Sequence, residues 1–343
     1  MKLNKVLSLT ALSTSLMGCA NDTPSFSLLS DTNVFNQGTV LNNKMDILWV
    51  IDNSGSMQPA QTNLANNFNS FIQSFSAKGY DYRMGVTTTD SWAALFGNAN
   101  LARLKDGTDA TSHTGVFVIK PNTPNLFPTF ATNITQGING IGDERAFQSF
   151  KTALSSTLNS DFRRSDAYLS VIIVSDEDDF SHNGSFSLNK NYASAALHTV
   201  QSYVTYLDTL TQSSGATRKY SVSGIAVWDQ ACKNASHAAA SIATRYAALV
   251  DATGGVKGSI CDNFATVLNQ IQNKIAELST QFFLNRTPVV TSIAVSVNGS
   301  AVPQDAANGW TYEASSNSVI FHGTAIPVQG SSVAITFDPT TIK

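Results

Sequence analysis

The sequence has little charge, few cysteines and no long apolar run. Only 13% of its 343 residues are Asp, Glu, Lys or Arg, about half the share usual in soluble domains. A formal net charge of −3 argues against general nucleic-acid binding, because no basic field is present to release counterions. Without an apolar run long enough to span a bilayer as a mature helix, a polytopic membrane protein is excluded. The 42% of hydrophobic residues excludes a disordered chain and predicts a sizeable core.

Several signatures of catalysis are also missing. The sequence contains no G-x-S-x-G, no H-E-x-x-H and no P-loop, and its five histidines show no metal-ligand spacing. Without a positioned base or nucleophile, enzymatic activity has no support. The sequence therefore predicts a protein that is not an enzyme.

The N-terminus has the pattern of an export signal. A positively charged start and a short apolar stretch make residues 1–18 a signal peptide. The run Leu16-Met17-Gly18-Cys19 resembles the bacterial lipobox, which implies cleavage before Cys19 and lipid attachment there. Ala20 rather than Asp follows, which by the same resemblance implies an outer-membrane lipoprotein, surface-exposed or periplasmic. The alternative is an ordinary signal peptide with a chance cysteine.

The next part of the chain alternates between strands and helices. Residues 45–51 form a nearly continuous apolar run, typical of a strand buried on both faces of a parallel sheet. Further strands are expected at 82–86, 116–119, 167–174, 220–228 and 256–260. Helices are expected from Leu64 to Phe75 and over 146–158, 196–210, 238–250 and 264–282, and 91–140 is loop-rich. This alternation predicts an α/β fold with a doubly wound, mostly parallel sheet.

The chain divides into four parts on this pattern. The signal peptide is followed by a lipid-anchored tether and edge segment at 19–44, and the α/β domain spans 45–283. After Pro288 the apolar residues alternate, and Asn298-Gly299 is a strong hairpin signal. Residues 284–343 are therefore expected to form a small all-β domain.

Carboxylates and hydroxyls follow two of the predicted strands. Asp52, Ser54 and Ser56 come directly after the first strand, and Asp176 follows the strand at 167–174. In an open α/β sheet, ligands bind beyond the carboxyl ends of the strands at the topological switch point. Carboxylate and hydroxyl oxygens suit Mg²⁺, with Ca²⁺ or Mn²⁺ as alternatives. A turn that only caps the next helix would use the same residues.

The run from Asp46 to Met57 resembles the opening of a von Willebrand factor A (VWA) domain. Its D-x-S-x-S is that family's metal-ion-dependent adhesion site (MIDAS), and the resemblance covers residues 45–283. It implies a divalent cation bound by Asp52, Ser54 and Ser56, with Asp176 matching the aspartate of the family's third loop.

The second loop departs from the family, which places a threonine before a helix. Glu144 is the occupant in this register, so we predict a third negative charge at the metal, although Glu144 could instead cap its helix. Asp90, Asp143 and Asp178 are candidates for a second layer around the ligands. The run Asp176–Asp179 is otherwise expected to be a solvated loop.

Cys232 and Cys261 follow two predicted neighbouring strands. In an exported protein this remaining pair predicts a disulfide, with free thiols or a metal site as alternatives.

These features predict a cell-surface lipoprotein that binds a protein or glycan partner through the metal. The tether and the β domain are expected on the side opposite the metal, which would face away from the membrane. One alternative is a structural component of the envelope with a purely stabilising metal, and another is a metal-dependent phosphoesterase.

Overall fold

The computed structural model describes residues 31–35, 44–77, 79–108, 112–236, 241–328 and 330–340. The expected signal peptide and the lipidation site Cys19 lie outside these residues. Within the described ranges, no helix is both long and apolar enough to cross a membrane.

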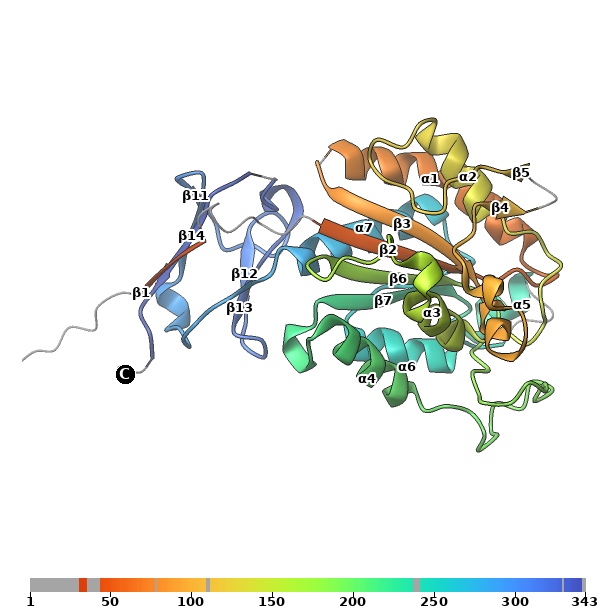
Figure 1. Ribbon diagram of the computed structural model, residues 1–343. Helices are drawn as coiled ribbons and strands as arrows, with labels where there is room; N and C mark the ends of the chain where they lie inside the picture. The colour runs from red at the N-terminus through yellow and green to blue at the C-terminus, as the bar shows by residue number, and fades with distance from the viewer. Residues whose placement is uncertain are drawn as a thin grey trace, which may run out of the picture.

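A five-stranded parallel sheet forms the centre of the larger domain (Figure 1). Its strands lie in the order β3-β2-β6-β7-β8, so the chain starts at β2, adds β3 on one side and then builds outward on the other. The predicted α/β class with a parallel sheet is confirmed. The strands are β2 (Lys44–Ile51), β3 (Asp81–Thr88), β6 (Tyr168–Val174), β7 (Tyr220–Ala226) and β8 (Lys257–Ser259).

Helices cover both faces of this sheet. One face packs against α1 (Gln58–Ala77), α2 (Leu126–Ile134) and α7 (Phe264–Ser279). The other packs against α3 (Ala146–Ser155), α4 (Val200–Thr211) and α6 (Thr244–Thr253), and the short α5 (Gln230–Ser236) follows β7.

The apolar run of β2 explains why both faces must be covered. Trp49 and its alternate neighbours lie in the core on the α1 side, whereas Leu48 and Val50 lie in the core on the α3 side. The Trp49 ring makes edge contacts with Phe71 and Phe130 at centroid distances of 5.7 Å. A continuous rather than alternating apolar pattern is what two buried faces require.

Three expected elements differ from those observed. The helix expected from residue 196 begins at Val200, because the Thr199 side chain accepts a hydrogen bond from the Ser202 amide and caps it there. The helix expected over 238–250 is observed as α6, which begins at Thr244, and residues 238–240 of the expected range lie outside the described residues. The strand expected at 116–119 is reduced to a single antiparallel bridge between Ile119 and Met84 of β3.

The loop-rich stretch 91–140 contains more structure than expected. Helix α2 was not predicted, and the 3₁₀ helices η1 (Ser91–Phe96) and η2 (Ala99–Ala102) follow β3. The remaining short elements are β4 (Gly107–Thr108), β5 (Ser112–His113), η3 (Thr157–Asn159) and η4 (Gly215–Thr217).

The C-terminal part is built from two small antiparallel sheets, in the orders β1-β14-β10-β11 and β12-β13-β9. The Asn298-Gly299 hairpin is confirmed between β10 and β11, and both turn residues have positive φ (50° and 81°). The elements are β9 (Phe282–Phe283), η5 (Val290–Ser292), β10 (Ala294–Val297), β11 (Ser300–Val302), β12 (Trp310–Glu313), β13 (Ser318–Phe321), η6 (Gly323–Ala325) and β14 (Val333–Phe337).

Strand β1 (Asp31–Phe35) belongs to the C-terminal module although it precedes the α/β domain. It pairs with β14, with Asp31 opposite Phe337. The segment expected as tether and edge strand therefore contributes to the small sheet, and the α/β domain lies between β1 and the rest of that module. The module sits at the end of the large sheet where β2 begins (Figure 1).

The predicted disulfide between Cys232 and Cys261 is confirmed, and it links α5 to the residues after β8 with a Cα–Cα distance of 5.8 Å. A C232S/C261S variant is expected to lose about 3 kcal/mol of unfolding free energy, because the bond closes a loop of 29 residues in the unfolded chain. Urea denaturation measures the loss, and the native protein reduced with dithiothreitol should match it. A loss below 1 kcal/mol would contradict the expectation.

Candidate metal centre

The loop after β2 holds the first predicted ligands at the carboxyl end of the sheet. The Asp52 carboxylate is buried and accepts hydrogen bonds from the Ser54 amide (2.8 Å) and the Ser175 hydroxyl (2.6 Å). The hydroxyl oxygens of Ser54 and Ser56 lie 3.5 Å apart. One carboxylate and two hydroxyls are thus gathered on a single turn.

A second loop packs closely on this turn. The Gly140 amide donates to the Asn53 carbonyl at 2.7 Å. A Cβ at position 140 would lie 2.4 Å from the Asn53 side chain, so a larger residue there would displace that side chain. The Gln61 side chain of α1 donates to the carbonyls of Asp52 and Gly137, both at 2.8 Å. These bonds fix the first loop from two sides.

Asp176 follows the neighbouring strand, as the sequence predicted. Ile51 is paired with Val174, and the Asp52 amide donates to the Val174 carbonyl at 2.9 Å. Burial raises the pKa of Asp52 to about 7, the hydrogen bonds from Ser175 and Ser54 oppose this rise, and the charge of Asp176 adds to it. The two carboxylates therefore act on each other across adjacent strands at the switch point.

Glu144 adds a third acid to this end of the sheet. Its side chain is completely buried, and neither carboxylate oxygen has a hydrogen-bond partner among the described residues. The pKa of Glu144 is raised to about 9, mainly by burial and also by the charges of Asp52 and Glu177. A buried carboxylate in this setting needs a proton or a cation to offset its charge.

Backbone hydrogen bonds at Glu144 and the next residue fix the position of Glu144. Its carbonyl accepts from the Phe180 amide at 2.8 Å, and the next amide, that of Arg145, donates to the Thr89 carbonyl at 3.1 Å. The loops after β3 and β6 thus hold the second loop between them. The Glu144 side chain forms no hydrogen bond with the first amides of α3, so the alternative that it caps this helix has no hydrogen bond to support it.

The acidic run Asp176–Asp179 is not a solvated loop, and that expectation was wrong. All four side chains are buried. Asp178 accepts hydrogen bonds from the Arg245 and Tyr246 amides at the start of α6, and Asp179 accepts from the Phe147 amide at the start of α3. Because the first amides of a helix lack partners within the helix, two of these acids are used as caps for distant helices.

The predicted second layer is divided by the structure. Asp90 accepts a hydrogen bond from the Asn53 side chain at 3.1 Å, so it contacts the loop after β2. The Asp178 carboxylate accepts hydrogen bonds from amides of helix α6, and its place in the second layer stays a prediction. The Asp143 carboxylate accepts a hydrogen bond from the Arg145 guanidinium at 2.9 Å, so its partner is Arg145 rather than a predicted ligand.

Sequence reasoning missed Arg145 and Glu177. Arg145 is fully buried, lies 3.6 Å from the centre of the Trp92 ring and donates to the carbonyls of Gly184 (2.6 Å) and Phe186 (2.9 Å). It ties the loop after β6 to the second loop. Glu177 is buried near Glu144 and forms an ion pair with Lys190. Its place directly after Asp176 was the available signal.

These donors fit a hard divalent cation. In the described part of the chain no three His, Cys, Asp or Glu side chains gather closely enough to hold a metal by themselves. The set here also includes hydroxyls, because Ser54 and Ser56 stand beside Asp52. In addition, Glu144 is buried and forms no hydrogen bond through its carboxylate among the described residues. Oxygen donors of mixed charge are those that Mg²⁺, Ca²⁺ and Mn²⁺ prefer.

No protein-family model matches the sequence, and no curated protein is significantly similar to it. Among solved structures, proximal thread matrix protein 1 from the mussel byssus is similar at 11% identity with a TM-score of 0.39, over 71% of this chain and 50% of that one. The pilus adhesin SpaC from Lactobacillus rhamnosus GG is similar at 12% identity with a TM-score of 0.42, over 86% of this chain and 39% of that one. The chain thus spans half or less of the length of either structure.

Proposed function

We propose that residues 45–283 form a VWA domain whose MIDAS holds a divalent cation and binds a partner. The observation that carries this proposal is the turn with Asp52, Ser54 and Ser56 at the switch point of the parallel sheet, beside Asp176 and the buried carboxylate of Glu144. We propose a binding protein rather than an enzyme.

The cation would be held by Asp52, Ser54 and Ser56, with Glu144 and Asp176 supplying negative charge. When bound, it provides a positive centre for an oxygen of the partner. Other residues of the chain orient the ligands. The Ser175 hydroxyl and the Ser54 amide orient the Asp52 carboxylate, and Asp90 accepts a hydrogen bond from Asn53 beside it. Mg²⁺ is the first candidate, with Ca²⁺ and Mn²⁺ as alternatives.

The rim around this site favours a protein partner over a glycan. Exposed apolar side chains stand on three loops that the site itself anchors: η1 after β3, the loop that contacts Asn53, and the loop held by Arg145. Such residues are typical of protein interfaces, where apolar contacts surround a polar centre. They are Leu95, Phe96, Ile138, Ile141 and Phe186.

The placement of the module supports an orientation in which the metal loops face away from the membrane. The small β module and the start of β2 lie at the end of the sheet opposite the metal loops (Figure 1). With Cys19 as the lipid attachment point of an outer-membrane lipoprotein, the metal face would point away from the membrane, toward the cell surface or the periplasm.

Metal titration tests the proposal first. Calorimetry should show binding of Mg²⁺, Ca²⁺ or Mn²⁺ to the native protein and at least tenfold weaker binding to Asp52→Ala, because a charged ligand of the cation is lost. Asp262→Ala, an exposed acid in the residues after β8, is the control and should bind as the native protein does. Equal affinity in Asp52→Ala would contradict the metal assignment.

Partner capture tests the second part of the proposal, that the bound cation is needed for binding a partner. Immobilised protein should retain envelope proteins in Mg²⁺ and release them in EDTA, and Ile141→Ser should weaken retention with metal affinity unchanged. If EDTA lowers the melting temperature but leaves retention intact, the metal is purely structural and the adhesion proposal fails. Metal-dependent turnover of a phosphoester would instead support the phosphoesterase.

A further inference from the structure

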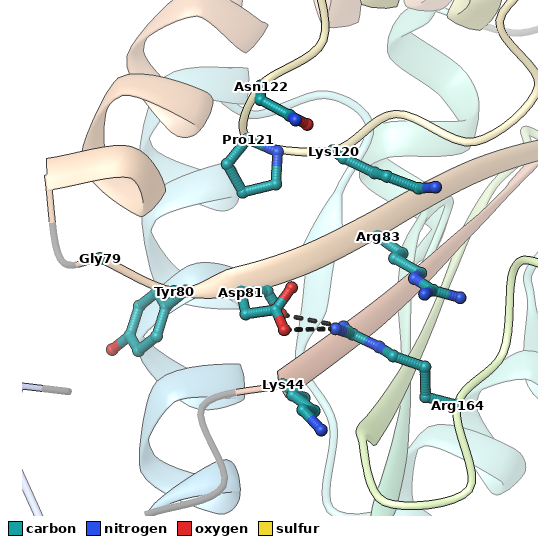
Figure 2. A pocket seen from close by; sticks show the side chains of 9 residues that line it. All are labelled: Lys44, Gly79, Tyr80, Asp81, Arg83, Lys120, Pro121, Asn122 and Arg164. Carbon is teal, nitrogen blue, oxygen red and sulfur yellow. Dashed lines mark hydrogen bonds and ion pairs between the residues drawn. The ribbon is translucent and has the colours of Figure 1, made fainter. Parts of the chain in front are cut away.

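A cavity of about 740 Å³ lies at the opposite end of the sheet from the metal loops, where β2 and β3 begin (Figure 2). Four of the nine lining residues are cationic and one, Asp81, is acidic. This contrasts with the chain as a whole, whose formal net charge is −3. Tyr80 and Pro121 supply apolar wall.

Two of the four cations are neutralised by carboxylates. Arg164 forms ion pairs with Asp46 at 2.8 Å and with Asp81 at 2.7 Å, and Lys44 forms one with Asp166. The pairs with Asp46 hold the start of β2 against the loop before β6. These two cations therefore have structural partners already.

Arg83 and Lys120 have no carboxylate partner among the described residues. The Arg83 guanidinium donates to the backbone carbonyl of Asp161, and no hydrogen bond or ion pair is formed by the Lys120 ammonium in the same ranges. Figure 2 shows both side chains extending in the same direction from neighbouring segments. Neither cation thus forms a direct ion pair, although Arg83 lies opposite Asp46 in the sheet, where burial raises the pKa of the Asp46 carboxyl and the Arg83 charge opposes that rise.

The backbone forces these two charges together. Met84 and Ile119 form an antiparallel bridge with both N–O distances at 2.8 Å, which places Arg83 directly across from Lys120. Like charges at directly opposed positions destabilise a sheet, because their side chains emerge on the same side at close range. An anion between them would turn this repulsion into attraction.

We propose that this cavity binds a phosphate-type oxyanion between Arg83 and Lys120. The planar guanidinium presents paired N–H donors that match two phosphate oxygens, and the ammonium acts as a mobile point charge. Lys44, the first residue of β2, lies at the margin where the chain enters the domain from its N-terminal side. The phosphate is supplied either by a lipid headgroup on that side or by a soluble phosphate compound.

Calorimetry with inorganic phosphate at low ionic strength tests the site. The native chain should bind phosphate, and R83Q/K120Q should bind at least about tenfold more weakly, because two charge-assisted hydrogen-bonding groups are lost. K151Q/K233Q removes the same charge from α3 and α5, outside the cavity, and should bind normally. Lys120→Gln alone should also weaken binding, and because the Lys120 ammonium forms no hydrogen bond or ion pair among the described residues, folding is not at risk.

Equal phosphate affinity in R83Q/K120Q and K151Q/K233Q, or absence of binding to the native chain, would overturn the proposal. Vesicle sedimentation of a Cys19→Ala chain distinguishes the sources. Preference for phosphatidylglycerol over phosphatidylcholine that is lost in R83Q/K120Q supports a headgroup. Phosphate binding by calorimetry without that preference supports a soluble phosphate compound.

Discussion

Replacing Arg145 by methionine is expected to lower the free energy of unfolding by about 3–5 kcal/mol, because the change leaves a buried carboxylate unpaired. Asp143 would lose its ion pair, and the carbonyls of Gly184 and Phe186 would lose their donors. The contact with the Trp92 ring would also lose its charge. Urea denaturation at pH 7 measures the effect.

A matched surface variant separates this effect from simple loss of positive charge. Lys257 pairs with Asp251 in an exposed position, so Lys257→Met is expected to cost less than about 1 kcal/mol. Asp143→Asn combined with Arg145→Met should be less destabilising than the sum of the single changes, because the double variant no longer buries an unpaired charge. An Arg145→Met protein as stable as Lys257→Met would contradict the role assigned to Arg145.

Without divalent cations, the protein is expected to lose stability as the pH rises from 5 to 8. Asp52 and Glu144 have pKa values of about 7 and about 9 in the folded state, above their ordinary values of 3.8 and 4.5. The folded state therefore binds more protons than the unfolded state between these limits, so stability is greatest at low pH and falls as the pH increases. For Asp52 alone the loss between pH 5 and pH 8 is about 3 kcal/mol.

Mg²⁺ or Ca²⁺ should reverse most of this loss, because the cation stabilises the ionised carboxylates of the folded state. Melting temperatures at pH 5, 6.5 and 8, with EDTA or with cation, provide the measurement. Glu144→Gln should flatten the pH profile in EDTA and weaken the effect of the cation. Identical profiles with and without cation would show that these carboxylates do not share a metal.

The sheet and the loop after β2 were predictable because their signals are local in sequence. The apolar run of β2 shows burial on both faces, and the residues directly after a strand end must lie at the carboxyl edge of the sheet. Glu144 came instead from the resemblance to the VWA family, as the residue at the position of that family's second-loop threonine, before a helix. The first two inferences need only a few neighbouring residues and the rule that parallel strands end at one edge.

The remainder depends on contacts between distant segments. Asp178 and Asp179 look like a solvated acidic run because their partners, the amides of α6 and α3, lie more than 30 residues away. In the sequence, Arg145 is only the third of three consecutive charged residues. The carbonyls that accept its hydrogen bonds belong to the loop after β6, so the neighbouring sequence does not reveal its role. Local patterns identify a helix cap two or three residues from its helix, but they do not identify one that reaches across the fold.

The pairing of β1 with β14 has a consequence for the order of folding. Asp31 and Phe337 are partners although the whole α/β domain separates them, so their contact closes a loop of roughly 300 residues. Folding of the α/β domain brings the two ends of that loop to one edge of the molecule and shortens the remaining search. We expect the small sheet to assemble last, as a late kinetic phase that slows when the α/β domain is destabilised.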